Sequence, residues 1–383
     1  MRSVVVAKYV PWPPNSGDKR RTLGVVRALA QQGPVVVCAF AGDDEDAAGL
    51  RDEGVEVRSL PRRRSLRRLT DGLLRSRSLT SARFWDGHLH RLVREESASA
   101  DVLVVEHVQL LPYARGARAA TTVLDMHNVE SSLTERYARS QRGLRRVVLG
   151  AEARRLRALE ARSTKADLLA VVSEGDAALL RDVVAHPHVV VVPNAWDEPT
   201  PLPPAPEPVV SFVALLSWAP NVDAATWFTS AVWPLVRDRV PGARLQLVGR
   251  NPAPAVQRLA ADDVQVTGTV PDLTPWYACT RVAVAPLRSG GGSRLKILEA
   301  LAHARPVVAT TVGAEGLEDL VGRGVVVADE AAAMAAEVVA LLLDPRRATE
   351  AGERGATAVA ADHSWTAATR PLVDALTAAG GPR

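Results

Sequence analysis

Two series of short apolar runs, separated by one proline-dense stretch, constrain the fold of this 383-residue chain most strongly. The first series extends from "SVVVAKYV" at residue 3 to "DLLAVVSE" at residue 167, and the second from "VVSFVALL" at residue 209 to "GVVVA" at residue 324. Segments with helical patterns alternate with the runs. Strands that are apolar throughout are typical of parallel sheets whose two faces are both covered by helices. Each series therefore predicts a doubly wound α/β domain.

The proline-dense stretch "WDEPTPLPPAPEP" marks a boundary between the two series. It can continue neither a helix nor a central strand, so we predict an extended interdomain linker at 196–208. This divides the chain into a Rossmann-like N-terminal domain at 1–195 and a Rossmann-like C-terminal domain at 209–363. A final helix over 364–383, with Ser364 as its N-cap, is expected to pack back on the N-terminal domain. Two such domains usually bind a ligand in the cleft where the carboxyl ends of their strands converge.

The composition narrows the class of protein further. A hydrophobic content of 47% and a charged content of 23% fit a folded globular chain. No run reaches the roughly 18 apolar residues of a membrane span, and the N-terminus reads as a first strand rather than a secretory signal. We therefore expect a cytoplasmic protein. Cys38 and Cys279 lack the spacing of a zinc site or a disulfide, which predicts two inert core thiols.

Residues 62–94 contain ten arginines and only two acidic residues. Leucines recur among them at helical spacing, at positions 66, 69, 73 and 74, which predicts an amphipathic helix with a cationic rim. A second basic helix is expected near 142–165. Each basic residue beside an anionic membrane adds roughly 1 kcal/mol of attraction. The pattern is compatible with peripheral contact at the inner face of an anionic membrane, and a solvated helix face is an equally open alternative. With 4% aromatic residues and no base-stacking pattern, no nucleic-acid partner is expected.

A glycine turn, made of Gly290, Gly291 and Gly292 with Ser293, follows the apolar run "RVAVAPL" and opens the helical segment "SRLKILEALAHA". At such a turn the free backbone N–H groups and the helix dipole attract an anion, and glycines permit a close approach. The turn lacks the Gly-Lys-Ser/Thr of a Walker loop. An ordinary loop is the plain alternative.

Two cations follow the glycine turn. Arg294 and Lys296 stand at the same helix end, a combination suited to a diphosphate. Lys296, Glu299 and His303 are predicted to share one helix face. Glu299 lies about 9 Å along the helix axis from Ser293, a reach suited to sugar hydroxyls beyond a phosphate. Solvated ion pairs among these side chains are the alternative interpretation.

Seven segments in order resemble the retaining family 4 glycosyltransferases of GT-B fold, in particular the bacterial branch that makes surface polysaccharides. Individually the motifs are weak, and their order and spacing across nearly the whole chain make the resemblance specific. They are "YVPWPPNSGDKRRT" from residue 9, "DMHNVES" from 125, "VVSEGDAALL" from 171, "VVPNAWD" from 191, "LLSWAPNVDAATWF" from 215, "GTVPDLTPWYACTRVAVAPL" from 268 and "GGGSRLKILEALAHARPVVATTVGAEGLE" from 290.

The resemblance implies a UDP- or GDP-sugar donor held mainly by the C-terminal domain. Its diphosphate would lie near Arg294 and Lys296, and Glu299 would take the ribose hydroxyls. Family members often have a glutamate where this chain has Gly291, and backbone N–H groups of the glycine turn would substitute for it. His127 would approach the donor sugar from the N-terminal domain. Gly17 would allow a close approach to the diphosphate, and weaker candidates for donor contacts are Asp18, Arg21 and Asn221.

The resemblance also implies the chemistry. A hexose-type sugar would move with retention to an acceptor hydroxyl on a lipid-linked glycan or a small molecule, without metal or cofactor. His127, Arg294 and Lys296 would be the catalytic residues, acting by positioning and by stabilising charge on the diphosphate. Two alternatives stay open at this point: a non-catalytic nucleotide-sugar binding protein and a sugar-nucleotide epimerase of the same fold.

Overall fold

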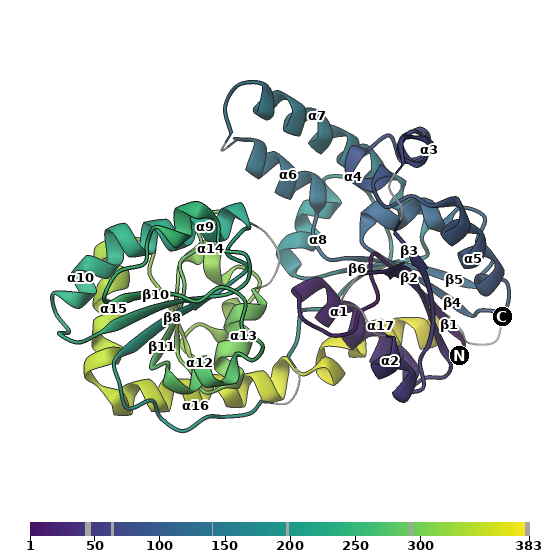
Figure 1. Cartoon of the computed structure of the whole chain (residues 1–383). Coiled ribbons are helices and arrows are strands. Elements are labelled where there is room, and N and C mark those ends of the chain that lie inside the picture. Colours follow the sequence, from purple (N-terminus) through teal and green to yellow (C-terminus); the bar gives the residue numbers. More distant parts are fainter. Residues whose placement is uncertain (43–46, 63–64, 140, 197–198, 291–293, 380–383) are drawn as a thin grey trace. The chain divides into compact units, whose positions relative to one another are not determined.

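The computed structural model describes the chain apart from residues 43–46, 63–64, 140, 197–198, 291–293 and 380–383 (Figure 1). The chain divides into two compact units. We call Met1–Pro193 with Ala368–Arg383 the N-unit, and Asn194–Ala367 the C-unit. Each unit contains one sheet that is parallel throughout, with helices on its faces. The α/β fold predicted from the apolar runs is confirmed.

The sheet of the N-unit has the strand order β3-β2-β1-β4-β5-β6-β7. The order reverses between β1 and β4, which is the topological switch point where open α/β sheets bind ligands. Six of the strands coincide with the predicted runs. The seventh, β7, was not predicted, because it is only three residues long and half-buried at the sheet edge. The strands are β1 (Ser3–Ala7), β2 (Val35–Ala41), β3 (Glu56–Pro61), β4 (Val102–Glu106), β5 (Thr121–Met126), β6 (Leu168–Val171) and β7 (Val189–Val191).

Two apolar cores lie on the two faces of this sheet. On one face, α1 and α2 pack with the C-terminal helix α17, whose Leu372 and Leu376 are buried there. Ser364 caps α17 by accepting a hydrogen bond from the Ala367 N–H group, as predicted. On the other face, α5, α7 and α8 contribute the core. The helices are α1 (Gly17–Ala30), α2 (Ala48–Asp52), α3 (Leu66–Ser76), α4 (Leu79–Ala82), α5 (Gly87–Ser97), α6 (Glu130–Arg139), α7 (Gly143–Glu160), α8 (Glu174–Arg181) and α17 (Trp365–Ala379).

The sheet of the C-unit has the order β10-β9-β8-β11-β12-β13, and its switch point lies between β8 and β11. All six strands coincide with predicted runs. They are β8 (Val209–Val213), β9 (Arg244–Val248), β10 (Val264–Val266), β11 (Val282–Ala285), β12 (Val307–Ala309) and β13 (Val325–Val327). The helices are α9 (Ala219–Trp227), α10 (Trp233–Arg237), α11 (Pro254–Gln257), α12 (Thr274–Cys279), α13 (Leu295–Ala302), α14 (Thr311–Ala314), α15 (Ala331–Leu343) and α16 (Pro345–Asp362).

The stretch predicted as a linker, 196–208, packs on the C-unit over its described residues. The buried Trp196 donates its backbone N–H group to the His363 carbonyl at 2.9 Å. Arg281 donates to the Pro206 carbonyl at 2.5 Å. The prediction of two core thiols was wrong for Cys279, which is exposed at the end of α12, whereas Cys38 is buried. Among the described residues, no helix has the length and apolarity needed to cross a membrane.

Candidate active site

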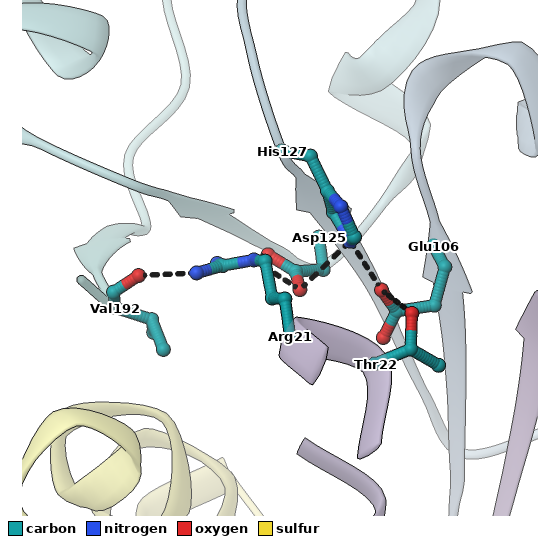
Figure 2. A network of polar contacts seen from close by, with 6 residues as sticks. All are labelled: Arg21, Thr22, Glu106, Asp125, His127 and Val192. Carbon is teal, nitrogen blue, oxygen red and sulfur yellow. Dashed lines mark hydrogen bonds and ion pairs between the residues drawn. The ribbon is translucent and has the colours of Figure 1, made fainter. Parts of the chain in front are cut away.

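Buried polar side chains gather at the switch point of the N-unit (Figure 2). They come from the carboxyl ends of two neighbouring strands and from the beginning of α1. The apolar run of each strand ends there, so the first polar residues of the two strands meet at one edge of the sheet. The group consists of Arg21 and Thr22 on α1, Glu106 and His107 at the end of β4, and Asp125 and His127 at the end of β5.

Arg21 and Asp125 form a buried ion pair, and each side chain is 1% exposed. The guanidinium donates to both carboxylate oxygens, from Nε at 3.0 Å and from Nη2 at 2.5 Å. Nη1 donates to the Val192 carbonyl at 2.7 Å. Such bidentate pairing fixes the geometry of both groups. Because these donors face protein acceptors, the arrangement favours a structural part for Arg21 over the predicted direct contact with a donor substrate.

His127 is buried next to this pair, and its Nε2 lies 2.6 Å from Glu106 Oε2. Thr22 donates its hydroxyl to the same carboxyl oxygen at 3.1 Å. The ring of His107 stacks on that of His127 with centroids 3.6 Å apart. Glu106 therefore fixes one edge of the His127 imidazole, and the His107 ring covers one of its faces.

Two further predicted residues begin α1 close to His127. Gly17 is the first residue of the helix, and Asp18 follows it. The Asp18 carboxylate accepts a hydrogen bond from the Ser16 hydroxyl at 2.5 Å and interacts electrostatically with His127. Ser16, as expected for the residue before a helix, has an extended backbone conformation. The N-unit thus brings Gly17, Asp18 and His127 to one edge of its sheet.

The predicted site residues did not include Glu106, Thr22, His107 or Asp125. The sequence contains a signal for Glu106 and His107, because the run "DVLVVEH" ends with an acidic residue and a histidine. The carboxyl end of a parallel strand is where ligands bind in open α/β sheets. The ligand atoms of Glu106, Asp125 and His127 lie within 4.8 Å of one another, an arrangement that could hold a metal ion. However, both Asp125 oxygens already accept from Arg21, whose charge opposes a cation there. We assign no metal to this cluster.

Gly290, the first residue of the predicted glycine turn, follows β11 at the carboxyl edge of the C-unit sheet next to the switch point. Gly291, Gly292 and Ser293 lie outside the described residues. Gly290 has a φ of 119°, and a Cβ atom there would lie 3.1 Å from the Trp218 side chain. The positive φ favours glycine at this position, and an added Cβ atom would crowd the Trp218 side chain.

Arg294 is buried immediately before α13. Its Nε and Nη2 donate to the Val312 carbonyl at 3.2 and 3.0 Å, and Nη2 lies 3.5 Å from the Glu315 carboxylate. These contacts anchor the guanidinium beside α14, at the helix start where the sequence predicted it.

Lys296 on α13 donates to the Asn221 side-chain oxygen at 2.8 Å, and its Nζ lies 4.7 Å from the centroid of the Phe212 ring. Asn221 in turn donates to the Leu215 carbonyl at 2.9 Å. Burial, with a smaller contribution from the charge of Arg294, lowers the pKa of Lys296 to about 7. Within the described part of the chain, Lys296 forms no ion pair with a carboxylate. Since the amide of Asn221 is neutral, an anion arriving here would find a positive charge that the protein has not neutralised.

Glu299 is half-buried on α13 and accepts a hydrogen bond from the Tyr277 hydroxyl at 3.4 Å. His303 follows the last residue of α13, and its ring lies 4.9 Å from the ring of Tyr277, the residue that contacts Glu299. α13 ends at Ala302, and the buried His303 places its Nδ1 3.2 Å from the Thr200 carbonyl.

Two family models match this chain. The model described as "Glycosyl transferase 4-like domain" matches residues 16–195, and the model described as "Glycosyl transferases group 1" matches residues 207–344. The chain is a family 4-type glycosyltransferase. A search of curated proteins gave no match.

Solved structures share the fold of this glycosyltransferase at low sequence identity. Sucrose-phosphate synthase from Thermosynechococcus elongatus matches with a TM-score of 0.70 and 18% identity, over 99% of this chain and all of that one. Anabaena HepE, solved in complex with UDP-glucose, matches with a TM-score of 0.69 and 14% identity, again over 99% of this chain and all of that one. A Rickettsia africae glycosyltransferase matches with a TM-score of 0.69 and 12% identity, over 100% of this chain and 99% of that one. These likenesses show the GT-B fold.

Each unit of the glycosyltransferase therefore offers a different set of groups at its own switch point. The N-unit presents an imidazole held in place by a buried carboxyl group and a second imidazole. The C-unit presents a guanidinium and an ammonium group next to a glycine turn. The first set can donate to or accept from a polar substrate atom, and the second can bind an anion.

Proposed function

We propose that this enzyme transfers a sugar from a UDP- or GDP-sugar to an acceptor hydroxyl with retention of the anomeric configuration. The observation that supports this best is the Lys296 ammonium group, which contacts a neutral amide and lies near the buried Arg294 at the switch point of the C-unit. A diphosphate would supply the missing negative charge. The complex of HepE with UDP-glucose is consistent with a donor of this class.

In this proposal Arg294 and Lys296 stabilise the charge that develops on the departing diphosphate. Glu299 accepts the ribose hydroxyls, and the glycine turn at 290–293 supplies backbone N–H groups. His127 contacts the donor sugar, and Gly17 and Asp18 border the same position. The acceptor oxygen bonds to the anomeric carbon while the bond to the phosphate oxygen breaks, and that phosphate oxygen takes the acceptor's proton. No metal takes part.

A thermal-shift series with UDP, GDP, ADP and their sugar conjugates tests the donor site. A ligand that binds only the folded protein raises its melting temperature by mass action. We expect one nucleotide series to raise the melting temperature of the wild-type protein and to fail with Glu299→Ala. No shift with any nucleotide would contradict the proposal.

Turnover separates the proposal from its alternatives. With donor and acceptor together we expect release of the nucleotide and a product whose anomeric proton coupling matches that of the donor. A protein that binds the donor without releasing nucleotide would be a binding protein. One that interconverts two donors without an acceptor would be an epimerase.

We further propose that the N-unit docks on an anionic membrane carrying a lipid-linked acceptor. α3 exposes Leu66 and Leu74, which are 83% and 81% exposed, and α7 exposes Leu144 at 78%. Both helices are rich in arginine. A hollow of about 530 Å³ at the amino ends of β5 and β6 is lined by further cations, none of which pairs with a carboxylate within the described part of the chain: Arg75, Arg115, Arg162 and Lys165. Exposed apolar groups among uncompensated cations fit an anionic lipid surface.

Sedimentation with vesicles tests this docking. We expect the protein to sediment with vesicles containing anionic lipid and not with neutral ones. The double variant Leu66→Ser, Leu74→Ser should lose most of this binding. Leu343→Ser removes an equally apolar side chain that is 64% exposed on the C-unit, and it should have no effect. Equal binding by all three proteins, or none by the wild type, would exclude the docking surface.

A further inference from the structure

The two carboxyl oxygens of Glu106 differ in their hydrogen bonding. Its Oε2 contacts His127 Nε2 at 2.6 Å and accepts from the Thr22 hydroxyl at 3.1 Å (Figure 2). Its Oε1 is buried and has no hydrogen-bond partner among the described residues, and the whole residue is 0% exposed. An ionised carboxylate would leave one charged oxygen buried and unpaired, at a cost of several kcal/mol. A protonated carboxyl group would leave only a neutral carbonyl oxygen there.

The distance between Glu106 and His127 also favours a carboxyl O–H donor. At 2.6 Å it is shorter than the usual range for an N–H donor and falls within the range for an O–H donor. A hydrogen bond from Glu106 Oε2 to His127 Nε2 requires the ring hydrogen of a neutral imidazole to sit on the other nitrogen, Nδ1. Within the described part of the chain, Nδ1 has no hydrogen-bond partner.

His107 prevents the ring of His127 from turning away. Its backbone has a φ of 68°, a conformation that non-glycine residues rarely adopt, and its N–H group donates to the Asp125 carbonyl at 2.8 Å. This places the two imidazole rings 3.6 Å apart at an angle of 37°. Nδ1 is therefore the nitrogen of His127 that remains available to a substrate atom.

Titratable and charged groups from α1 and from the ends of three strands surround the pair. Arg21, Lys8 and the side-chain hydrogen bonds with Thr22 and Asp125 favour the ionised form of Glu106, whereas Asp18 disfavours it. Burial outweighs these charges and raises the pKa of Glu106 to about 7, and burial lowers the pKa of His127 to about 3. The titratable and charged groups that face the pair are Lys8 after β1, Asp18 and Arg21 on α1, His107 after β4 and Asp125 on β5.

We propose that one proton lies between Glu106 Oε2 and His127 Nε2 in either form of the pair, so that the protonation of Glu106 decides whether Nδ1 of His127 donates or accepts. With Glu106 protonated, the O–H group occupies Nε2 and Nδ1 presents an N–H group. When Glu106 loses its proton to solvent, its carboxylate needs a donor. The single ring hydrogen then moves from Nδ1 to Nε2, and Nδ1 presents a lone pair. The exchange of roles takes place near neutral pH, and Glu106 acts as a positioning residue for His127.

This inference rests on the proposed function in one respect only, the identity of the substrate atom that contacts Nδ1. We take that atom to be an oxygen of the sugar nucleotide. An oxygen that gains negative charge during transfer accepts a hydrogen bond from N–H, so the protonated pair is the active form. Transfer should therefore decline as pH rises above neutrality.

Nitrogen NMR of protein labelled with ¹⁵N-histidine tests the shared proton without any activity. The signals of His127 are those that disappear in His127→Gln. Between about pH 6 and pH 8 we expect the hydrogen of the wild-type ring to move from Nδ1 to Nε2. Glu106→Gln cannot lose a proton, so its His127 should keep one form across this range. Glu160→Gln is the matched control, because Glu160 is also buried in the N-unit and bonds Ser131 instead of His127. A wild-type His127 with a single form over the whole range would overturn the inference.

The pH profile of turnover shows what the switch does. We expect kcat of the wild type to fall about tenfold for each pH unit above the midpoint, and Glu106→Gln to lack this limb. We use kcat because it reports the complex, in which the bound diphosphate keeps Lys296 charged, whereas kcat/KM would also report the titration of free Lys296. A merely structural Glu106 would instead lower activity equally at every pH. If the NMR switch occurs in a protein that transfers no sugar, the proposed function fails and the shared proton stands. If sugar is transferred but the alkaline limb survives in Glu106→Gln, the proposed function stands and the part assigned to Glu106 fails.

Discussion

Both units place charged side chains at the carboxyl edge of their sheet near the switch point, but they balance the charge differently. In the N-unit, Arg21 is neutralised by Asp125 and both are buried. In the C-unit, Lys296 contacts a neutral amide, and Arg294 contacts a backbone carbonyl and lies 3.5 Å from the half-exposed carboxylate of Glu315. A buried ion pair fixes the geometry of the sheet edge, whereas an excess of positive charge attracts an anionic substrate. One topology thus supports two different uses of its switch point.

Breaking the balanced pair should have the largest effect. Arg21→Met leaves the Asp125 carboxylate buried and unpaired, which should cost roughly 3–5 kcal/mol in the free energy of unfolding. Hydrogen exchange of peptides from β1 and β5 would measure the loss. Arg27→Met removes an exposed partner of Glu53 from the same helix and should cost less than about 1 kcal/mol. Similar losses in both variants would show that the buried pair does not stabilise the N-unit.

Removing the excess charge should abolish most activity and leave the fold intact. For Arg294→Ala with Lys296→Ala we expect kcat/KM to fall by about 10²–10³-fold, because charge on the leaving diphosphate is no longer stabilised. Circular dichroism would check the fold. Arg288→Ala is the control from the same loop, since Arg288 already pairs with Asp223 at the surface. Unchanged transfer by the double variant would refute the role of these cations.

Giving Lys296 an acidic partner, as Asp125 is for Arg21, should weaken nucleotide binding. Asn221→Asp places a carboxylate 2.8 Å from the Lys296 ammonium group, if it keeps the present geometry. Neutralising this cation should raise the dissociation constant of the nucleotide about tenfold. Asn221→Leu removes the contact without adding charge, so calorimetry should find a smaller loss. A tighter complex with Asn221→Asp would contradict the assignment of an anion to this position.

The titration of Lys296 should couple both folding and nucleotide binding to a change in bound protons. Its pKa lies near 7 in the free protein and near 10.5 in an unfolded chain, so between these values the folded state binds fewer protons. Stability of the free protein should therefore rise with pH across this window. A bound phosphate favours the charged lysine, so nucleotide binding above neutrality should take up a proton. Calorimetry in buffers of different ionisation enthalpy measures this uptake, which Lys296→Met should abolish. Equal uptake in the variant would assign it to another group.

Local patterns in the sequence predicted much of the fold. Buried parallel strands need apolar residues on both faces, so twelve strand positions could be recognised from runs such as "VVVCAF". β7 escaped recognition because a three-residue, half-buried edge strand has too little of this pattern. The positions of Arg294 and Lys296 at the start of a helix also followed from a local signal, the glycine turn before "SRLKILEALA".

The sequence by itself thus determined the order of the elements and the chemical types available at their ends. Only the tertiary structure decided which of these groups meet. Glu106 and His127 are 21 residues apart, and Arg21 and Asp125 are 104 apart. Their contacts exist because strands β4 and β5 are neighbours and α1 begins beside them. The pKa of a side chain and its choice of partner depend on burial and on charges from distant segments, and neither is encoded by the residues next to it in the chain.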